Sequence, residues 1–217
     1  MNANADFRQQ FVDFAIRQNA LCFGEFKTKA GRLSPYFFNS GLFSDGAALA
    51  ELTRFYAQAA LASGLTFDIL FGPAYKGITL AAGTAMALAA MGHNLPFCFN
   101  RKEAKDHGEG GLIVGAPLKG RVLIIDDVIT DGASKRESVE MIRAAGATPA
   151  SVLIALDRQE RGVGEWSAAQ EFKQNYAVPV IAVATLQDIL HYLAAQPGAD
   201  EKFDKIENYR RQYGAKI

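Results

Sequence analysis

The sequence predicts an α/β protein whose parallel sheet is covered by helices on both faces. Short apolar runs recur from residue 67 onward, and helix-like segments separate most of them. Such unbroken apolar runs are typical of strands buried on both faces, and their alternation with helices is typical of parallel sheets. The chain has 217 residues, of which 49% are hydrophobic. It is long enough for one well-formed core, so we expect a single domain over residues 1–217.

The first part of the chain predicts two helices and a small sheet. Residues 7–18 place Phe7, Phe11 and Phe14 on one face of a helix. Residues 22–39 form short alternating runs around a turn at 30–32, as in a hairpin. A second helix is predicted over 47–62.

The remaining elements follow in a regular order. Strands are predicted at residues 67–72, 95–100, 122–127, 151–157 and 179–185, and helices at 77–91, 134–145 and 186–194. In sheets of this kind the ligand binds beyond the carboxyl ends of the strands. The residues that directly follow each strand are therefore the candidates for function.

Composition excludes several classes of function. The chain carries 23 basic and 23 acidic residues, whereas proteins that hold nucleic acid by bulk charge show a basic excess. The polar N-terminus contains no apolar signal segment, and no stretch is apolar enough to cross a bilayer. Cys22 and Cys98 lie far apart in apolar surroundings, which favours buried reduced thiols. We expect a soluble cytoplasmic protein that binds neither nucleic acid nor membrane.

The segment VLIIDDVITDGAS (122–134) is the strongest functional signal. An apolar strand ends in the carboxylates of Asp126 and Asp127, and a short loop then leads into a helix. The free amides and the dipole of a helix N-terminus favour an anion, to which Thr130 and Ser134 add hydroxyl donors. Paired carboxylates accept hydrogen bonds from vicinal sugar hydroxyls and stabilise developing positive charge. The alternative, an ordinary helix with Ser134 as its N-cap, explains only part of this pattern.

This run closely resembles the PRPP-binding motif of type I phosphoribosyltransferases (PRPP is 5-phosphoribosyl 1-diphosphate). The resemblance implies that Asp126 and Asp127 hold the ribose hydroxyls and act in catalysis. It also implies a type I fold with an N-terminal hood over approximately residues 1–45. The residues expected to bind PRPP in this segment are Asp126, Asp127, Val128, Ile129, Thr130, Asp131, Gly132, Ala133 and Ser134. Asp131 and Ala133 depart from many relatives, which carry a small neutral residue and a threonine there.

Two further segments resemble the same family. The turn after residues 67–72 carries Tyr75 and Lys76, and it is similar to the loop that meets the diphosphate. Lys76 by itself is also compatible with a solvated lysine. The run NRKEAKDHGEGG (100–111) is charged and ends in glycines, which is typical of a mobile surface loop. It resembles the catalytic lid of orotate phosphoribosyltransferases, and we expect a mobile lid over approximately residues 100–118.

The lid resemblance implies specific roles and an assembly. Arg101, Lys105 and His107 contact the diphosphate, and Lys102 contacts it from the partner subunit of a homodimer. Lys105 and His107 are candidate catalytic groups, because they can donate a proton to the departing diphosphate or neutralise its charge.

The pyrimidine end of the site also depends on the resemblance. Arg158 follows the strand at 151–157, and its planar fork matches a carboxylate on the base. The run FGEFKTKAGRLSPYFFN (23–39) is similar to that of the orotate enzymes. It implies that Lys29 contacts both PRPP and orotate and that Phe37 and Phe38 form a platform for the base, although aromatic clusters are usually core. Thr130 is also expected to contact orotate.

Together these segments imply transfer of the phosphoribosyl group of PRPP to orotate, in pyrimidine biosynthesis. Magnesium is expected as cofactor, bound mainly through PRPP, because no cluster of metal-ligand spacing is visible.

Three alternative functions are to be weighed against this one. Purine phosphoribosyltransferases lack a substrate carboxylate for Arg158. PRPP-sensing regulators lack the lid or carry a basic DNA-binding module. Rossmann-like binders carry G-x-G-x-x-G where this chain has FGPAYKG (71–77).

Overall fold

The computed structural model describes residues 3–28, 30–105, 111–129, 133–162 and 164–216. Within them a six-stranded sheet has the order β5-β4-β3-β6-β7-β8, and β1 and β2 form a separate two-stranded sheet. The strands are β1 (Leu21–Lys27), β2 (Leu33–Phe38), β3 (Ile69–Gly72), β4 (Phe97–Lys105), β5 (Gly111–Gly115), β6 (Arg121–Ile125), β7 (Thr148–Asp157) and β8 (Val180–Thr185). The helices are α1 (Ala3–Arg17), α2 (Gly46–Ala62), α3 (Lys76–Ala90), α4 (Ala133–Ala144), α5 (Ala168–Tyr176), α6 (Leu186–Ala194) and α7 (Asp200–Tyr213).

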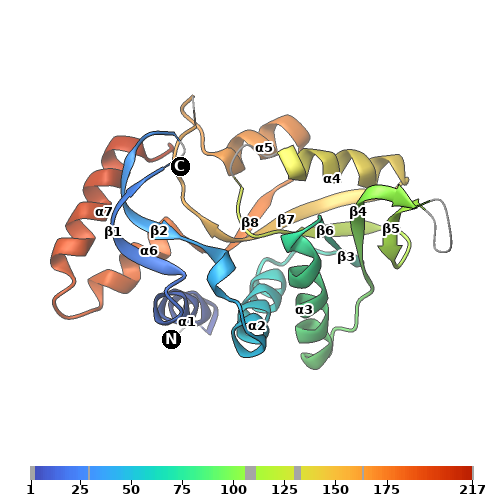
Figure 1. Ribbon diagram of the computed structural model, residues 1–217, viewed down its shortest axis with the longest axis horizontal. Coiled ribbons are helices and arrows are strands. Elements are labelled where there is room, and N and C mark those ends of the chain that lie inside the picture. The colour runs from blue at the N-terminus through green and yellow to red at the C-terminus, as the bar shows by residue number, and fades with distance from the viewer. Residues whose placement is uncertain (1–2, 29, 106–110, 130–132, 163, 217) are drawn as a thin grey trace.

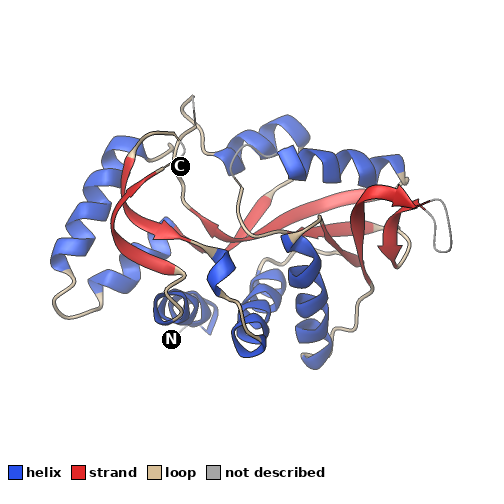
Figure 2. Ribbon diagram, in the orientation of Figure 1, coloured by secondary structure: helices blue, strands red, loops and turns tan. Residues whose placement is uncertain are grey.

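The large sheet lies between two layers of helices, as the sequence predicts. Helices α2 and α3 cover one face, and α4 and α5 cover the other (Figure 1). The small β1–β2 sheet lies beside α6 and α7 at one end of the molecule (Figure 2). The pairs β3–β4, β3–β6, β6–β7 and β7–β8 are all parallel. The predicted α/β class with a central parallel sheet flanked by helices is therefore confirmed.

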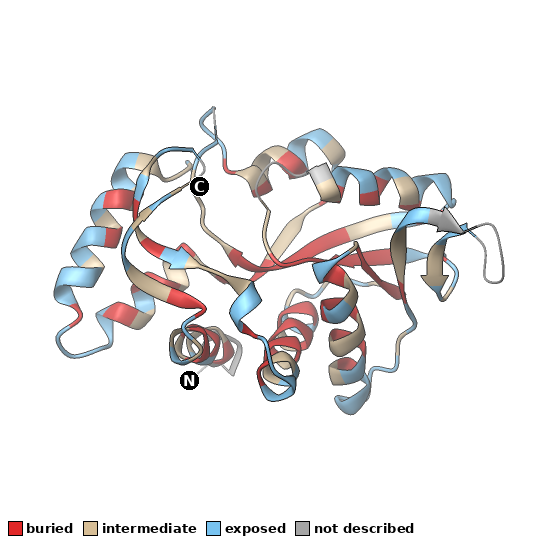
Figure 3. Cartoon of the chain, in the orientation of Figure 1, coloured by how far each residue is buried: buried red, intermediate tan, exposed pale blue. Residues whose placement is uncertain are grey.

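Side chains of the central strands alternate between two cores. Leu123 of β6 points into the core shared with α1, α2 and the β1–β2 sheet, whereas Ile124 points into the core beneath α4 and α5. The same alternation holds for Leu153 and Val152 of β7. Because both faces are buried, these strands need apolar residues at every position, which explains their unbroken apolar runs (Figure 3).

The structure differs from the sequence-based expectation at one edge of the sheet. The sequence predicts a loop from residue 100, but β4 continues through Lys105 and pairs antiparallel with β5. The charged part of β4 lies beyond Phe97, Cys98 and Phe99, the residues that pair with β3. It therefore pairs with β5 alone, and its charges resemble those of a loop in the sequence. Helices α5 and α7, which the sequence patterns do not predict, complete the fold. Both cysteines are free, but only Cys98 is buried; Cys22 is partly exposed, so the expectation of two buried thiols is wrong for Cys22.

Close contact between β3 and the start of α3 depends on glycine. A Cβ added at Gly72 would collide with the carbonyl oxygen of Gly77 and lie 2.8 Å from Cβ of Ala81. A Cβ at Gly77 would lie 2.7 Å from the carbonyl oxygen of Ile125, at the end of β6. These glycines let α3 begin directly against the ends of two strands.

Replacing Gly72 by Ala is expected to lower the free energy of unfolding by about 1–3 kcal/mol, because backbone atoms there cannot yield to a methyl group. Urea unfolding measures this change. Gly46→Ala is the matched control, since a Cβ at Gly46 meets nothing within 4 Å. An equal loss in both variants would contradict the packing argument.

Candidate active site

The polar residues that follow β3, β6 and β7 lie together at the carboxyl ends of these strands, because the three neighbouring strands run in the same direction. Lys76 begins α3 after β3, Asp126 and Asp127 follow β6, and Arg158 follows β7. The carboxyl ends of the strands are the place at which parallel α/β sheets bind ligands.

Asp127 is held by a lysine and a serine from other segments. Its Oδ2 accepts hydrogen bonds from Lys76 Nζ at 2.7 Å and from Ser40 Oγ at 2.8 Å, and Lys76 also donates to Ser40 at 3.1 Å. The other oxygen, Oδ1, accepts from the backbone amide of Val128. Burial raises the pKa of Asp127, but the hydrogen bonds from Lys76 and Ser40 outweigh this effect, and the pKa lies below its ordinary value. Asp127 is therefore an anion at neutral pH.

Asp126 is more deeply enclosed than Asp127. Its Oδ2 lies 2.5 Å from Lys135 Nζ, and its Oδ1 accepts from the backbone amide of Asp127 at 2.9 Å. The carbonyl oxygen of Asp126 accepts from Tyr56 Oη at 2.8 Å. Burial raises the pKa of the Asp126 carboxyl above its ordinary value, and Lys135 opposes that rise. The two neighbouring carboxylates thus have different environments and pKa shifts of opposite sign.

A second cluster surrounds Arg158. Oε1 of Glu160 accepts from Arg158 Nε at 2.8 Å, and Arg158 also donates to Ser34 Oγ at 3.0 Å. The guanidinium carbon lies 4.3 Å from the centre of the Tyr36 ring. Tyr36 and Tyr209 both donate their hydroxyls to Glu160. Burial raises the pKa of Tyr36 well above its ordinary value, so the phenol stays protonated and remains a donor. Arg158 is therefore held in one orientation by its neighbours.

Strand β2 joins these two clusters. Ser34 and Tyr36 contact the Arg158 cluster, and Ser40, two residues beyond the strand, contacts Asp127. Phe37 and Phe38 lie between these contacts in the chain. Their side chains point in opposite directions, as successive strand residues do. Phe37 is exposed and stacks on Phe26, whereas Phe38 packs on Phe11 and Phe43 in the core.

The predicted diphosphate loop is tied to β4. The backbone amide of Ala74 donates to Asn100 Oδ1 at 2.9 Å, and Asn100 is the residue before Arg101. Tyr75 and Lys102 are exposed. Arg101 donates to the carbonyl oxygen of Gly111 at 3.2 Å, across the β4–β5 pair. The start of the predicted lid is thereby connected to the loop that carries Lys76.

Some predicted site residues fall outside the described part of the chain. These are Lys29, His107, Thr130, Asp131 and Gly132, together with the side chains of Lys105 and Ala133. Val128 and Ile129 are partly buried beside Asp127. Ser134 lies in the first turn of α4, which begins at Ala133, so it is not the cap residue suggested by the alternative interpretation.

Several residues of the two clusters were not identified from the sequence: Ser34, Ser40, Tyr56, Lys135, Glu160 and Tyr209. Asn100, which holds the predicted diphosphate loop, was also not identified. Glu160 stands in the run LDRQERG (156–162), where its proximity to Arg158 was a usable signal. Ser40 and Lys135 gave no such signal, because their partners are distant in the chain or lie on another element.

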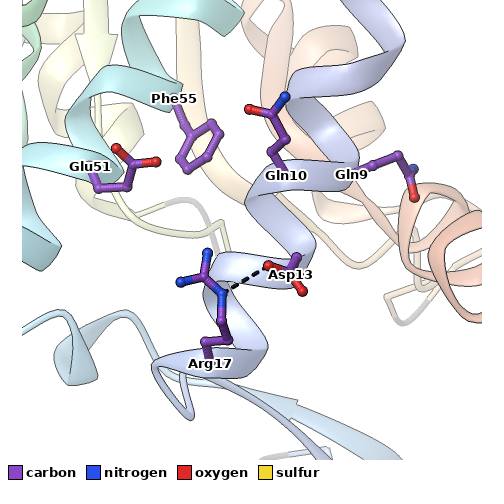
Figure 4. A pocket seen from close by; sticks show the side chains of 6 residues that line it. All are labelled: Gln9, Gln10, Asp13, Arg17, Glu51 and Phe55. Carbon is purple, nitrogen blue, oxygen red and sulfur yellow. Dashed lines mark hydrogen bonds and ion pairs between the residues drawn. The ribbon is translucent and has the colours of Figure 1, made fainter. Parts of the chain in front are cut away.

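A separate cleft lies between α1 and α2, and its lining includes none of the predicted site residues that the structure describes. It is lined by Gln9, Gln10, Asp13, Arg17, Glu51 and Phe55, and its volume is about 330 Å³ (Figure 4). Arg17 donates to Asp13 at 2.8 Å, so the two charged groups nearest each other already neutralise one another. We therefore assign the function to the strand ends rather than to this cleft.

Comparison with known proteins identifies the family of the chain. Residues 42–172 match the model of the phosphoribosyl transferase domain. The chain is 62% identical to the orotate phosphoribosyltransferase of Laribacter hongkongensis, over 98% of this chain and 100% of that one. It is 60% identical to the enzyme of the same name from Thiobacillus denitrificans, over 97% and 99%. The crystal structure of orotate phosphoribosyltransferase from Francisella tularensis superimposes with a TM-score of 0.86 at 41% identity, covering 95% of this chain and 100% of that one. The chain thus belongs to the orotate phosphoribosyltransferase family of phosphoribosyl transferases.

Proposed function

We propose that this chain transfers the phosphoribosyl group of PRPP to orotate, giving orotidine 5-monophosphate and diphosphate in pyrimidine biosynthesis. One observation carries the residue assignment. A carboxylate–lysine pair for the sugar and diphosphate (Asp127 and Lys76) lies at the same end of the sheet as an oriented arginine for a carboxylate (Arg158). Ser34 of β2 contacts the arginine, and Ser40, just after β2, contacts the pair. A site for one anion alone does not need both groups.

The sugar end of the site consists of the two carboxylates and the loop after them. Asp126 and Asp127 accept hydrogen bonds from the ribose hydroxyls, and the start of α4 with residues 130–134 receives the 5-phosphate. The bond from the anomeric carbon to diphosphate breaks as the bond to the orotate nitrogen forms. Positive charge develops on the sugar in between, and the two anionic side chains stabilise it.

The leaving diphosphate is met by cations. Lys76 is paired with Asp127, but its side chain is 58% exposed, so it can exchange this partner for a phosphate oxygen at small cost. Lys102, Arg101, Lys105 and His107 approach on the lid, which excludes water and adds positive charge. Lys105 and His107 neutralise the diphosphate or protonate it as it leaves.

Magnesium is proposed as a cofactor that PRPP brings with it. Among the described residues no group of three or more His, Cys, Asp or Glu side chains is placed to hold a metal ion. The oxygens of Asp126 and Asp127 already face Lys135, Lys76 and backbone amides. This donor set suits an ion held by phosphate and hydroxyl oxygens of the substrate. When bound, magnesium neutralises part of the diphosphate charge.

Orotate is expected at the Arg158 cluster. The guanidinium meets the carboxylate of the base, while Glu160, Ser34 and Tyr36 keep the fork in its orientation. Lys29, Thr130 and the backbone of Phe37 and Phe38 complete the site for the pyrimidine. Uracil and the purines lack the carboxylate and leave Arg158 without a partner on the ligand.

Replacing Arg158 by Met is expected to raise KM for orotate by about a hundredfold, with a much smaller change in KM for PRPP, because a charged hydrogen-bonded pair with the base is lost. Initial rates with each substrate varied in turn measure the two constants. Arg158→Lys keeps the charge without the planar fork, so its KM for orotate should lie between that of Arg158→Met and that of the unmodified protein. Arg161→Met is the control, since Arg161 is exposed. Equal rises in both KM values would contradict the assignment of Arg158 to the base.

The experiment that tests the function is a spectrophotometric assay with PRPP, magnesium and one base at a time. Orotate should be consumed, and uracil, adenine and hypoxanthine should not. Consumption of a purine but not orotate would overturn the base assignment and leave phosphoribosyl transfer intact.

The assembly and location are also part of the proposal. We take residues 1–217 as one domain with a hood over about 1–45 and a mobile lid over about 100–118, acting in a homodimer that shares lids between subunits, in the cytoplasm. Tyr75 and Met86, at the start of α3 and within it, are large exposed side chains suited to a contact between subunits. No helix in the described ranges combines the length and apolar character that a bilayer span requires.

A further inference from the structure

Lys135 occupies a position on α4 where an apolar residue is expected. The buried face of this helix is formed by Lys135, Ser138, Val139 and Ile142, which follow the spacing i, i+3, i+4 and i+7. Val139 and Ile142 belong to the core between α4 and the sheet. Lys135 itself is only 6% exposed. Burying an ammonium group costs several kcal/mol unless a partner offsets it, so its presence requires a specific compensation.

That compensation comes from the first carboxylate of the PRPP motif. Lys135 Nζ lies 2.5 Å from Asp126 Oδ2, and both side chains are 8% exposed. The other oxygen of Asp126 accepts from the backbone amide of Asp127. Both oxygens of this carboxylate are therefore held from within the protein, on the side of α4 and the loop.

The two carboxylates of the motif pair with lysines that differ in solvent exposure. Lys76, the partner of Asp127, is 58% exposed and is free to move toward the diphosphate. Lys135 is enclosed, and if it moved away it would leave the buried carboxylate of Asp126 without its cation. The groups that face Asp126 are Lys135 from α4, Asp127 from its own loop, and Tyr56 from α2, whose hydroxyl donates to the Asp126 carbonyl. Lys76 from α3 reaches this group only through Asp127. Lys135 is thus the one cation in direct contact with Asp126 among the described residues.

We propose that Lys135 is a positioning residue for phosphoribosyl transfer, which holds the buried Asp126 carboxylate ionised and correctly oriented from behind. The inference rests on the proposed function, and it adds a residue outside the PRPP motif to the machinery of the reaction. With Lys135 in place, Asp126 keeps its charge when Lys76 turns to the diphosphate. Without it, Asp126 stands in an apolar enclosure beside another anion, and both burial and Asp127 favour its protonated form. A protonated Asp126 neither stabilises the cationic sugar nor accepts as strongly from a hydroxyl.

The test compares Lys135→Met with two other variants. Lys135→Arg keeps the charge, and Arg136→Met removes an exposed cation from the next position of the same helix. Steady-state rates are measured between about pH 5 and about pH 9 with PRPP varied, and again with orotate varied. For Lys135→Met, KM for PRPP should rise about tenfold or more through loss of a charged hydrogen bond. The acid limb of kcat/KM for PRPP should move to higher pH, and KM for orotate should change little. Lys135→Arg should keep the acid limb near that of the unmodified protein, and Arg136→Met should match the unmodified protein throughout.

Other outcomes have distinct meanings. A Lys135→Met protein that unfolds at lower temperature but has an unchanged acid limb and KM for PRPP would show a lysine that only supports packing, and would overturn the proposal. If this variant does not fold, Lys135→Gln replaces it, because an amide still donates to Asp126 without charge; an unchanged pH profile there would be equally decisive. Failure of the proposed function itself is separate, since the unmodified protein would then not convert orotate and PRPP in the same assay.

Discussion

Replacing Asp127 by Ala is expected to lower kcat/KM for PRPP by about a hundredfold to a thousandfold, the usual effect of removing one preorganised group from a site of developing charge. Under the proposed function, the substitution removes an acceptor for a ribose hydroxyl and one of the two negative charges next to the anomeric carbon. It also frees Lys76 and Ser40, which both donate to Asp127 Oδ2. Initial rates with PRPP varied at saturating orotate measure the change.

The control for this substitution is Asp68→Ala. Asp68 is also a carboxylate in an ion pair, with Arg121 at 2.8 Å, but it lies before β3, at the end of the strand opposite the site. Its removal should leave kcat/KM close to that of the unmodified protein. Activity of Asp127→Ala within about twofold of normal would contradict the assignment, because loss of even one charged hydrogen bond exceeds that change.

Replacing Lys105 by Ala is expected to lower kcat by about a hundredfold or more, with a smaller change in KM for PRPP, because proton donation and charge neutralisation act on the departing diphosphate. The side chain of Lys105 lies outside the described part of the chain, so this prediction depends on the resemblance of residues 101–111 to the family's lid. Its backbone ends β4, where Lys105 pairs with Gly111. Lys119→Ala, an exposed lysine beyond the hairpin, is the control. Unchanged turnover would remove Lys105 from the mechanism.

The same two variants test whether the lid acts on the partner subunit. Asp127→Ala protein keeps an intact lid, and Lys105→Ala protein keeps an intact sugar site. When the two are mixed and subunits exchange, a mixed dimer with a shared lid regains one complete site. Activity above the sum of the separate proteins is therefore expected. A strictly additive result, with subunit exchange verified by differently tagged chains, would place each lid over its own site.

Much of the fold followed from local patterns. The buried strands β3, β6 and β7 need apolar residues at every position, and this requirement is visible in the sequence as unbroken apolar runs such as residues 122–125. The positions of Lys76, Asp126, Asp127 and Arg158 at one sheet edge followed from parallel strand order. The hairpin of β4 and β5 was missed because the charged half of β4 extends beyond β3 and pairs with β5 alone, and its residues resemble those of a loop.

The sequence by itself determined the α/β class and the candidate site residues at the strand ends, because these depend on periodicity and on neighbouring residues. Only the tertiary structure decided which charges meet. Ser40 reaches Asp127 across 87 positions, and Arg158 reaches Ser34 across 124. Lys135 stands nine residues after Asp126, yet their contact requires α4 to pack on the sheet with that face inward. Such pairings depend on the packing of whole elements, and they give two adjacent carboxylates opposite pKa shifts that no local pattern distinguishes.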